Sequence, residues 1–204
     1  MYKIIDEKTT YIDDLAEIGD GTIIYPNVTI MGRTKIGKDN IIESNTVIKN
    51  SVIGKNNKII SSYITSSTVG DNNEIGPYAH LRDRVEIGNN NLIGNFVEIK
   101  ETVIENNNYI KHLSYLGNTK MGSNNNFSAG AITANYDWKT DRHYRTIIEN
   151  NSLIGANSVL IAPIKVEDKS VVAAGSVINR RVKERDLAIA RPRQQNIKDY
   201  VEGE

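Results

Sequence analysis

Aliphatic residues recur at every sixth position along much of this chain, and the positions between them are mostly polar. The first run consists of isoleucines only: Ile18, Ile24, Ile30, Ile36, Ile42 and Ile48. The rhythm continues to Phe127 with occasional steps of five, stops, and restarts from Ile148 to Ile178. A period of six matches neither a helix of 3.6 residues per turn nor a simple alternating strand. It predicts short strands separated by corners, the pattern of a parallel β-helix built from hexapeptides.

The residues after the aliphatic positions favour tight corners. Asn and Gly recur there, as in the segments IGKNN, VGDNN, IGNNN and MGSNN, and these residue types tolerate left-handed backbone angles. Three hexads make one triangular coil of about 18 residues. Coils are expected to stack about 4.8 Å apart with the aliphatic side chains inside. We therefore expect an all-β fold, a parallel β-helix over residues 18–183 with roughly eight or nine coils.

Three segments lack this rhythm. Residues 133–146 (TANYDWKTDRHYRT) contain the only tryptophan, and a long excursion from a regular solenoid is usually functional or an interaction arm. Residues 184–204 are expected to form a C-terminal arm, extended to about Pro192 and followed by a short helix. Residues 1–17 are expected to be a linker or the lead-in to the first coil.

Charge and cysteine content narrow the classes of function. Lys and Arg number 25, as do Asp and Glu, so no net charge attracts nucleic acid or anionic lipid. The absence of cysteine excludes disulfides, thiolate metal sites and a cysteine nucleophile. No apolar stretch approaches the roughly 18–20 residues of a membrane span, and the first residues lack the signature of a secretion signal. We expect a cytoplasmic protein that binds neither nucleic acid nor membrane.

Seven motifs within residues 75–191 occur in the order and nearly the spacing of one family. They are IGPYAHLR, GNFVEIK, KHLSYLGN, NNFSAGAITANYD, LIGANSVLIAP, VVAAGSVI and LAIARPRQ. In these motifs, and more weakly back to about Tyr11, the chain resembles the acetyltransferase domain of the bifunctional bacterial N-acetylglucosamine-1-phosphate uridyltransferase/glucosamine-1-phosphate acetyltransferase. Nothing in the chain resembles the uridyltransferase domain. It is expected to be either a stand-alone acetyltransferase or part of a longer protein.

The resemblance implies a left-handed β-helix, a homotrimer and a reaction. That reaction transfers an acetyl group from acetyl-CoA to the amine of glucosamine-1-phosphate, a step of UDP-N-acetylglucosamine and cell-wall biosynthesis, without a metal. His112, in KHLSYLG, matches the catalytic base. The residues that match sugar-phosphate contacts are Arg82, Lys100, Tyr115 and Asn126. Those that match acetyl-CoA contacts are Ala129, Asn135, Tyr136, Ala156, Ala174 and Arg191.

This chemistry is consistent with the residue types. An amine attacks a thioester only when it is unprotonated, so a group must remove a proton near neutral pH. Histidine, with an ordinary pKa of about 6.5, suits that task. The amine is itself the nucleophile, so neither serine, cysteine nor metal is required. Backbone N–H groups of the SAGAITANY segment are candidates for stabilising the negative charge that develops on oxygen.

Arg82 and Lys100 are one coil apart in the sequence, and each follows an aliphatic residue of the inward series. They are therefore expected on one face, about 4.8 Å apart. Two cations that close repel unless an anion lies between them or a carboxylate screens them. A phosphate is such an anion. The alternative is an ordinary charged face with Glu98 or Glu101 as counter-ion.

Other functions stay open on the sequence alone. Departures from the family pattern, at Ser128, at Ala156 and in the longer segment 137–146, leave room for another amino sugar or a hydroxyl group as acceptor. A metalloenzyme would need clustered histidines, but His80 is read as a corner residue and His143 as an exposed loop residue. A catalytically silent scaffold is the remaining alternative.

Overall fold

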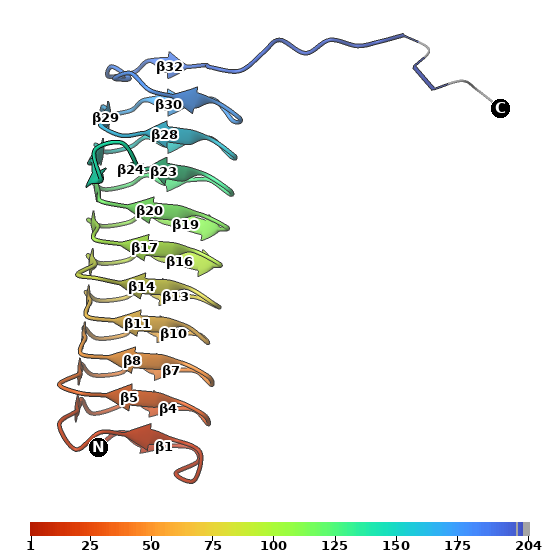
Figure 1. Cartoon of the computed structure of the whole chain (residues 1–204). Helices are drawn as coiled ribbons and strands as arrows, with labels where there is room; N and C mark the ends of the chain where they lie inside the picture. Colours follow the sequence, from red (N-terminus) through yellow and green to blue (C-terminus); the bar gives the residue numbers. More distant parts are fainter. Residues whose placement is uncertain (199, 202–204) are drawn as a thin grey trace.

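Each hexapeptide forms a short strand followed by a corner, and three of them complete one coil of a left-handed parallel β-helix (Figure 1). The structure is a computed structural model that describes residues 1–198 and 200–201. It has about ten turns. This is more than the expected eight or nine because residues before 18 and after 183 also contribute strands. The predicted fold class is confirmed.

Three parallel sheets form the sides of the prism, here called faces A, B and C. Face A consists of β1 (Lys3–Ile4), β4 (Ile23–Ile24), β7 (Ile41–Ile42), β10 (Lys58–Ile59), β13 (Glu74–Ile75), β16 (Leu92–Asn95), β19 (Tyr109–His112), β22 (Asn126–Phe127), β27 (Leu153–Ile154), β30 (Val171–Val172) and β32 (Leu187–Ala188). Face B consists of β2 (Tyr11–Ile12), β5 (Thr29–Met31), β8 (Val47–Lys49), β11 (Tyr63–Thr65), β14 (His80–Arg82), β17 (Glu98–Lys100), β20 (Tyr115–Gly117), β23 (Ile132–Ala134), β28 (Val159–Ile161) and β31 (Val177–Ile178). Face C consists of β3 (Glu17–Ile18), β6 (Lys35–Ile36), β9 (Val52–Ile53), β12 (Thr68–Val69), β15 (Glu86–Ile87), β18 (Val103–Ile104), β21 (Thr119–Met121), β26 (Thr146–Ile148) and β29 (Ile164–Val166).

The aliphatic series fills the interior of the prism. Its members from Ile24 to Ile178 are buried, and Ile18 is partly buried against them. Backbone N–H groups of one coil donate to carbonyls of the next, as from Ile23 to Asn40 at 2.8 Å. Burial of the aliphatic side chains and pairing of the backbone between coils therefore stabilise the same geometry.

Asparagine has two structural roles at the corner between faces C and A. In the segment IGKNN, Asn56 has the left-handed φ of 56° that the corner requires. The next residue, Asn57, is buried, and its Oδ1 accepts the Asn73 backbone N–H at 2.8 Å. A ladder of such buried asparagines runs through six coils, at Asn40, Asn57, Asn73, Asn91, Asn108 and Asn125.

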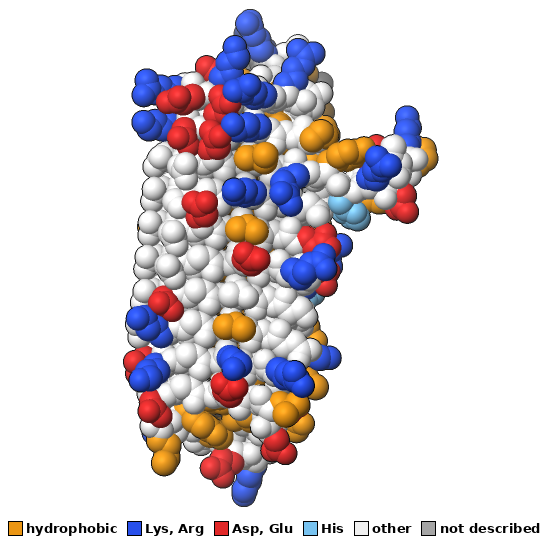
Figure 2. Space-filling model, turned by 90° about the vertical axis from the view of Figure 1, so that its left-hand side faces the viewer, with side chains coloured by type: hydrophobic (Ala, Val, Ile, Leu, Met, Phe, Trp, Pro, Cys, Tyr) orange, Lys and Arg blue, Asp and Glu red, His pale blue; other side chains and the backbone are white. Residues whose placement is uncertain are grey.

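The excursion is a β-hairpin between faces B and C. Strands β24 (Tyr136–Asp137) and β25 (Arg142–His143) pair antiparallel. The hairpin stands away from the prism in Figure 2. The solenoid resumes at β26.

The predicted helix after Pro192 is wrong for the residues that the structure describes. They continue as an extended segment that leaves the last coil (Figure 1). Ile197 and Val201 are exposed there, so no apolar surface supports a helix, and an isolated short helix is marginal in water. Residues 199 and 202–204, which the predicted arm includes, lie outside the described residues. The described part of the chain contains no helix long and apolar enough to cross a membrane.

Candidate functional site

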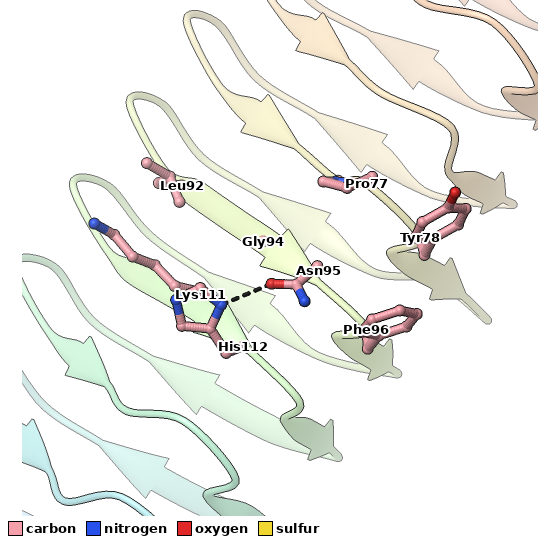
Figure 3. A pocket seen from close by; sticks show the side chains of 9 residues that line it. Pro77, Tyr78, Leu92, Gly94, Asn95, Phe96, Lys111 and His112 are labelled. Carbon is pink, nitrogen blue, oxygen red and sulfur yellow. Dashed lines mark hydrogen bonds between the residues drawn. The ribbon is translucent and has the colours of Figure 1, made fainter.

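His112 ends strand β19 at the corner between faces A and B. Its Nδ1 lies 2.6 Å from Oδ1 of Asn95, its register partner on β16 (Figure 3). The imidazole is exposed and borders a cavity of about 370 Å³. The cavity is lined by Gly76, Pro77, Tyr78, Leu92, Gly94, Asn95, Phe96, Lys111 and His112. It therefore presents a histidine beside mostly apolar walls.

Three of the residues predicted to contact acetyl-CoA continue the column above His112. This corner column consists of residues at one position of consecutive coils, Asn95, His112, Ala129, Ala156 and Ala174. Each of the first four carbonyls accepts a corner N–H of the following coil, at 2.7–3.2 Å. The Ala174 carbonyl instead accepts a hydrogen bond from Nη1 of Arg191, at 2.5 Å. The column thus contains the predicted base and three of the six residues predicted to contact the donor, and a fourth, Arg191, binds its last member.

Arg82 and Lys100 are register partners on face B, as the coil length predicts. The Arg82 guanidinium contacts the carboxylates of Asp83 and Glu98, each at 2.7 Å. The hydrogen bond with Glu98 raises the pKa of Arg82. In this chain Arg82 therefore fits the alternative expected from the sequence, an ordinary charged face with Glu98 as counter-ion. Among the described residues, no carboxylate lies within 4.0 Å of the Lys100 ammonium.

Tyr115, a predicted sugar contact on face B, lies beside Asn135, a predicted donor contact. A Cβ placed on Gly117 would lie 2.5 Å from both the Tyr115 Oη and the Asn135 Nδ2, so glycine leaves room for this contact. Burial raises the pKa of Tyr115, and a hydrogen bond with Asn135 opposes that shift. Asn135 is itself buried and donates to Asn118 Oδ1 at 2.6 Å.

Other predicted site residues lie apart within this single chain. The cavity beside His112 includes neither Arg82 nor Lys100, which belong to face B. Asn126 is exposed on β22 and is the register partner of Tyr109 rather than of His112. Tyr136 lies in the hairpin, which follows the opposite edge of face B.

The hairpin covers a second cavity of about 640 Å³. Its lining is largely apolar and aromatic: Ala134, Tyr136, Asp137, Trp138, Tyr144, Val159, Ile161, Ala162 and Pro163. The predicted donor residue Tyr136 thus lines a cavity different from that of His112.

The other two histidines each contact a tyrosine ring. His80 belongs to strand β14, where its ring meets Tyr63 edge-on with centroids 5.4 Å apart, so its reading as a corner residue is wrong. His143 is exposed in the hairpin and tilts against Tyr136. Within residues 1–198 and 200–201, no group of three or more His, Cys, Asp or Glu side chains is placed to hold a metal ion.

Three bulky residues beside the His112 cavity were missed by the sequence reading. Tyr78, Phe96 and Leu113, here called the corner ridge, have φ angles of 59°, 56° and 49° and are 61%, 55% and 63% exposed. The Tyr78 and Phe96 rings stack with centroids 5.4 Å apart. Left-handed angles are costly for such side chains. The signal was present in the sequence, since Tyr and Phe stand where other corners have Asn or Gly.

Comparison with known sequences finds hexapeptide repeats. The family "Bacterial transferase hexapeptide (six repeats)" matches residues 16–50 and 66–101, and "Hexapeptide repeat of succinyl-transferase" matches residues 145–180. The chain is 45% identical to "Bifunctional protein GlmU" of Clostridioides difficile (strain 630) and 46% identical to that of Caldanaerobacter subterraneus subsp. tengcongensis, in each case over 98% of its own length. It spans 43% of the length of these two relatives.

Solved structures share the fold. The UDP-N-acetylglucosamine acyltransferase of Arabidopsis matches with a TM-score of 0.77 and 21% identity, over 90% of this chain and 70% of that one. The enzyme of Francisella novicida matches with a TM-score of 0.63 and 22% identity, over 93% and 67%. With hexapeptide repeats in three parts of the chain, stacked three-sided coils and similarity to GlmU proteins along nearly the whole sequence, this chain belongs to the bacterial hexapeptide-repeat transferases.

Proposed function

We propose that this chain transfers the acetyl group of acetyl-CoA to the amine of glucosamine-1-phosphate, as an acyltransferase of the UDP-N-acetylglucosamine pathway. The observation that carries the proposal is 45% identity over 98% of the chain to a bifunctional GlmU protein. The motifs shared with the acetyltransferase domain of that family include the segments around His112, Arg82 and Lys100. Because acetyl-CoA is an intracellular donor, we place the reaction in the cytoplasm.

His112 is proposed as the general base. Its imidazole takes a proton from the amine while the amine nitrogen bonds to the thioester carbonyl carbon. The carbon–sulfur bond then breaks, and the coenzyme A thiolate receives the proton. A positioned base of this kind contributes about 10²–10⁴-fold to the rate. The exposure of His112 at the edge of a cavity supports this role because both substrates must reach the ring.

The corner column is proposed to hold the donor. Above His112 it presents only the methyl groups of Ala129, Ala156 and Ala174. Three steps of about 4.8 Å make this strip about 14 Å long, and Arg191 lies at its far end. A long thin thioester can lie on such a strip with its reactive end at His112 and its phosphates at the guanidinium. Asn135 and Tyr136, at the other edge of face B, are proposed as donor contacts only by the resemblance.

The acceptor site is proposed to form between two copies of the chain. Arg82, Lys100 and Tyr115 lie on face B, whereas His112 lies at the corner with face A. A homotrimer in which this corner meets face B of a neighbour would join the two groups, and closed cyclic symmetry is the usual form of such assemblies. The exposed corner ridge supports this arrangement. Its three bulky side chains have a costly backbone conformation, and burying their apolar surface in an interface would lower the free energy of the assembly.

In this arrangement Lys100 meets the phosphate, and Tyr115 and Asn126 contact the sugar. Lys100 suits this role because its charge has no carboxylate partner in the described part of the chain, whereas Arg82 already contacts two. Two carboxylates already neutralise the Arg82 guanidinium, so its charge does not require a phosphate. This observation favours a second candidate function, in which the acceptor is an amino sugar without phosphate.

The test is thiol release from acetyl-CoA with glucosamine-1-phosphate, with glucosamine, and with no acceptor. The proposal predicts rapid release with the phosphorylated sugar and a KM at least about tenfold higher with glucosamine, since a charge-assisted contact contributes about 1.5–3 kcal/mol. Equal kinetic constants for the two sugars would favour the second candidate. No release above the acceptor-free rate with either sugar would overturn the proposed reaction.

A further inference from the structure

The backbone is built so that Asn95 and His112 meet. Strands β16 and β19 each have four residues, whereas every other strand of the described residues has two or three. Asn95 and His112 are the last residues of these two strands and are paired in register. Gly94 permits the close approach, because a Cβ there would lie 1.9 Å from the Lys111 carbonyl oxygen. The contact between the two side chains is therefore supported by the local backbone.

The atom that Asn95 presents to the ring has a chemical consequence. A carboxamide oxygen accepts hydrogen bonds and does not donate them. The Asn95 Oδ1 lies 2.6 Å from the His112 Nδ1, so that nitrogen must carry the proton. A neutral imidazole has one N–H only, and the Nε2 atom is then left with its lone pair. The lone pair is what a general base needs.

We propose that Asn95 is a positioning residue that holds His112 as the Nδ1–H tautomer, with Nε2 free to accept the proton of the substrate amine. This inference rests on the proposed function for the role of His112, but not for the tautomer itself. A neutral carboxamide holds the ring without adding a negative charge beside it. A carboxylate in the same place would form an ion pair with the protonated ring. With the carboxamide, no such ion pair opposes the later release of the proton to the thiolate.

Two variants separate the hydrogen bond from the space that the side chain fills. Asn95→Leu keeps a similar volume but removes the acceptor, and Asn95→Asp keeps an acceptor oxygen. Asn89→Leu is the matched control, since Asn89 is exposed at another corner and is in neither the cavity nor the corner column. Circular dichroism and oligomeric state of all three variants establish that each is folded.

The direct readout is ¹⁵N NMR of the imidazole nitrogens in histidine-labelled protein at alkaline pH, without substrates. The chain has three histidines, and His112→Gln identifies the signals of His112. The expected result is a proton on Nδ1 in the parent and in Asn95→Asp, with a shift towards Nε2–H in Asn95→Leu. A proton on Nε2 in the parent, or the same tautomer in the parent and in Asn95→Leu, would overturn the proposal whatever the outcome of the transfer assay.

Kinetics test the consequence for the reaction. In Asn95→Leu we expect kcat to fall by about tenfold or more with the KM for both substrates nearly unchanged, while Asn95→Asp retains more of the activity and Asn89→Leu all of it. Unchanged kcat in Asn95→Leu would refute the positioning role even if the tautomer shifts. A chain that transfers no acetyl group would refute the proposed function and leave the tautomer assignment standing on the NMR result.

Discussion

Arg82 and Lys100 are register partners on adjacent coils of face B, yet only Arg82 has carboxylate partners within the described residues. Asp83 and Glu98 neutralise the guanidinium, both at 2.7 Å. The Lys100 ammonium is therefore the charge of this pair that an anionic substrate can use without first displacing a carboxylate.

Replacing Lys100 should weaken recognition of phosphate specifically. In Lys100→Met, which keeps the length of the side chain, we expect the KM for glucosamine-1-phosphate to rise about tenfold or more, because a charge-assisted contact of about 1.5–3 kcal/mol is lost. The KM for glucosamine should change little. Steady-state kinetics with both sugars measure this, with Lys120→Met on face C as the control. Equal increases for both sugars would mean that Lys100 does not read the phosphate.

The corner ridge should matter for assembly rather than for folding of the single chain. Asparagine tolerates the left-handed angle of Phe96 better than phenylalanine does, so Phe96→Asn should leave the β-helix intact. The loss of a buried aromatic contact costs about 2 kcal/mol or more at an interface. Sedimentation velocity should therefore show an assembly that dissociates at a concentration at least about tenfold higher. Phe96→Tyr is the control, and assembly of Phe96→Asn as tight as that of the parent would place the ridge outside the interface.

The asparagine ladder should contribute strongly to stability. Asn91 donates from Nδ2 to Asn73 Oδ1 and to the Glu105 carbonyl, and its Oδ1 accepts the Asn108 N–H. Asn91→Ala leaves the Asn108 N–H and the Glu105 carbonyl without these partners, at about 1–3 kcal/mol each. We expect a loss of about 3 kcal/mol or more in denaturant unfolding.

The exposed Asn179, which is not part of the ladder, serves as the control. For Asn179→Ala a change below about 1 kcal/mol is expected, as for most surface substitutions. If the two variants lose the same stability, the internal ladder has no special role.

Asp168 should make the last coils sensitive to acid. Its carboxylate accepts the Asn150 backbone N–H at 2.7 Å and the Asn150 Nδ2 at 3.0 Å, and these bonds lower the pKa of Asp168 in the folded chain. A lowered pKa stabilises the fold above the ordinary value of about 3.9. This contribution is lost as the pH falls through the folded-state pKa.

The acidic and basic side chains around Asp168 gather on the last coils in Figure 2. The neighbouring Glu167 acts in the same direction. Burial raises the pKa of Glu167, but hydrogen bonds from Arg181 and the Glu184 N–H outweigh this and leave it below its ordinary value. The melting temperature of the parent should therefore fall more steeply from about pH 5 to pH 2 than that of Asp168→Asn. Parallel curves for the two proteins would contradict the assignment.

Periodicity predicted the interior of this protein well because an inward position repeats in every coil. The same arithmetic placed Lys100 beside Arg82. It did not reveal the contact between Asn95 and His112, which are 17 residues apart, since the single five-residue step before Ile104 shortens that coil. A count of the local steps would have found the pair.

Two other features depend on information that periodicity does not contain. The contacts of Arg82 with Asp83 and Glu98 depend on side-chain rotamers, which a repeat pattern leaves open. The helix expected after Pro192 depended on a surface to support it, and the described residues there leave the prism. The proposed contact of the His112 corner with face B of a neighbour would be a property of an assembly, which the repeat pattern of one chain does not describe.

The central claim is that one active site combines His112 of one copy with Lys100 of another. Complementation tests it most directly. His112→Ala and Lys100→Met, each expected to be nearly inactive at low glucosamine-1-phosphate, are co-expressed in equal amounts so that mixed trimers form. Random assembly gives each shared site both wild-type residues with a probability of one half times one half, so about a quarter of the wild-type activity should return. Activity no higher than the mean of the two parent variants would show that each copy builds its site alone, and would contradict the account.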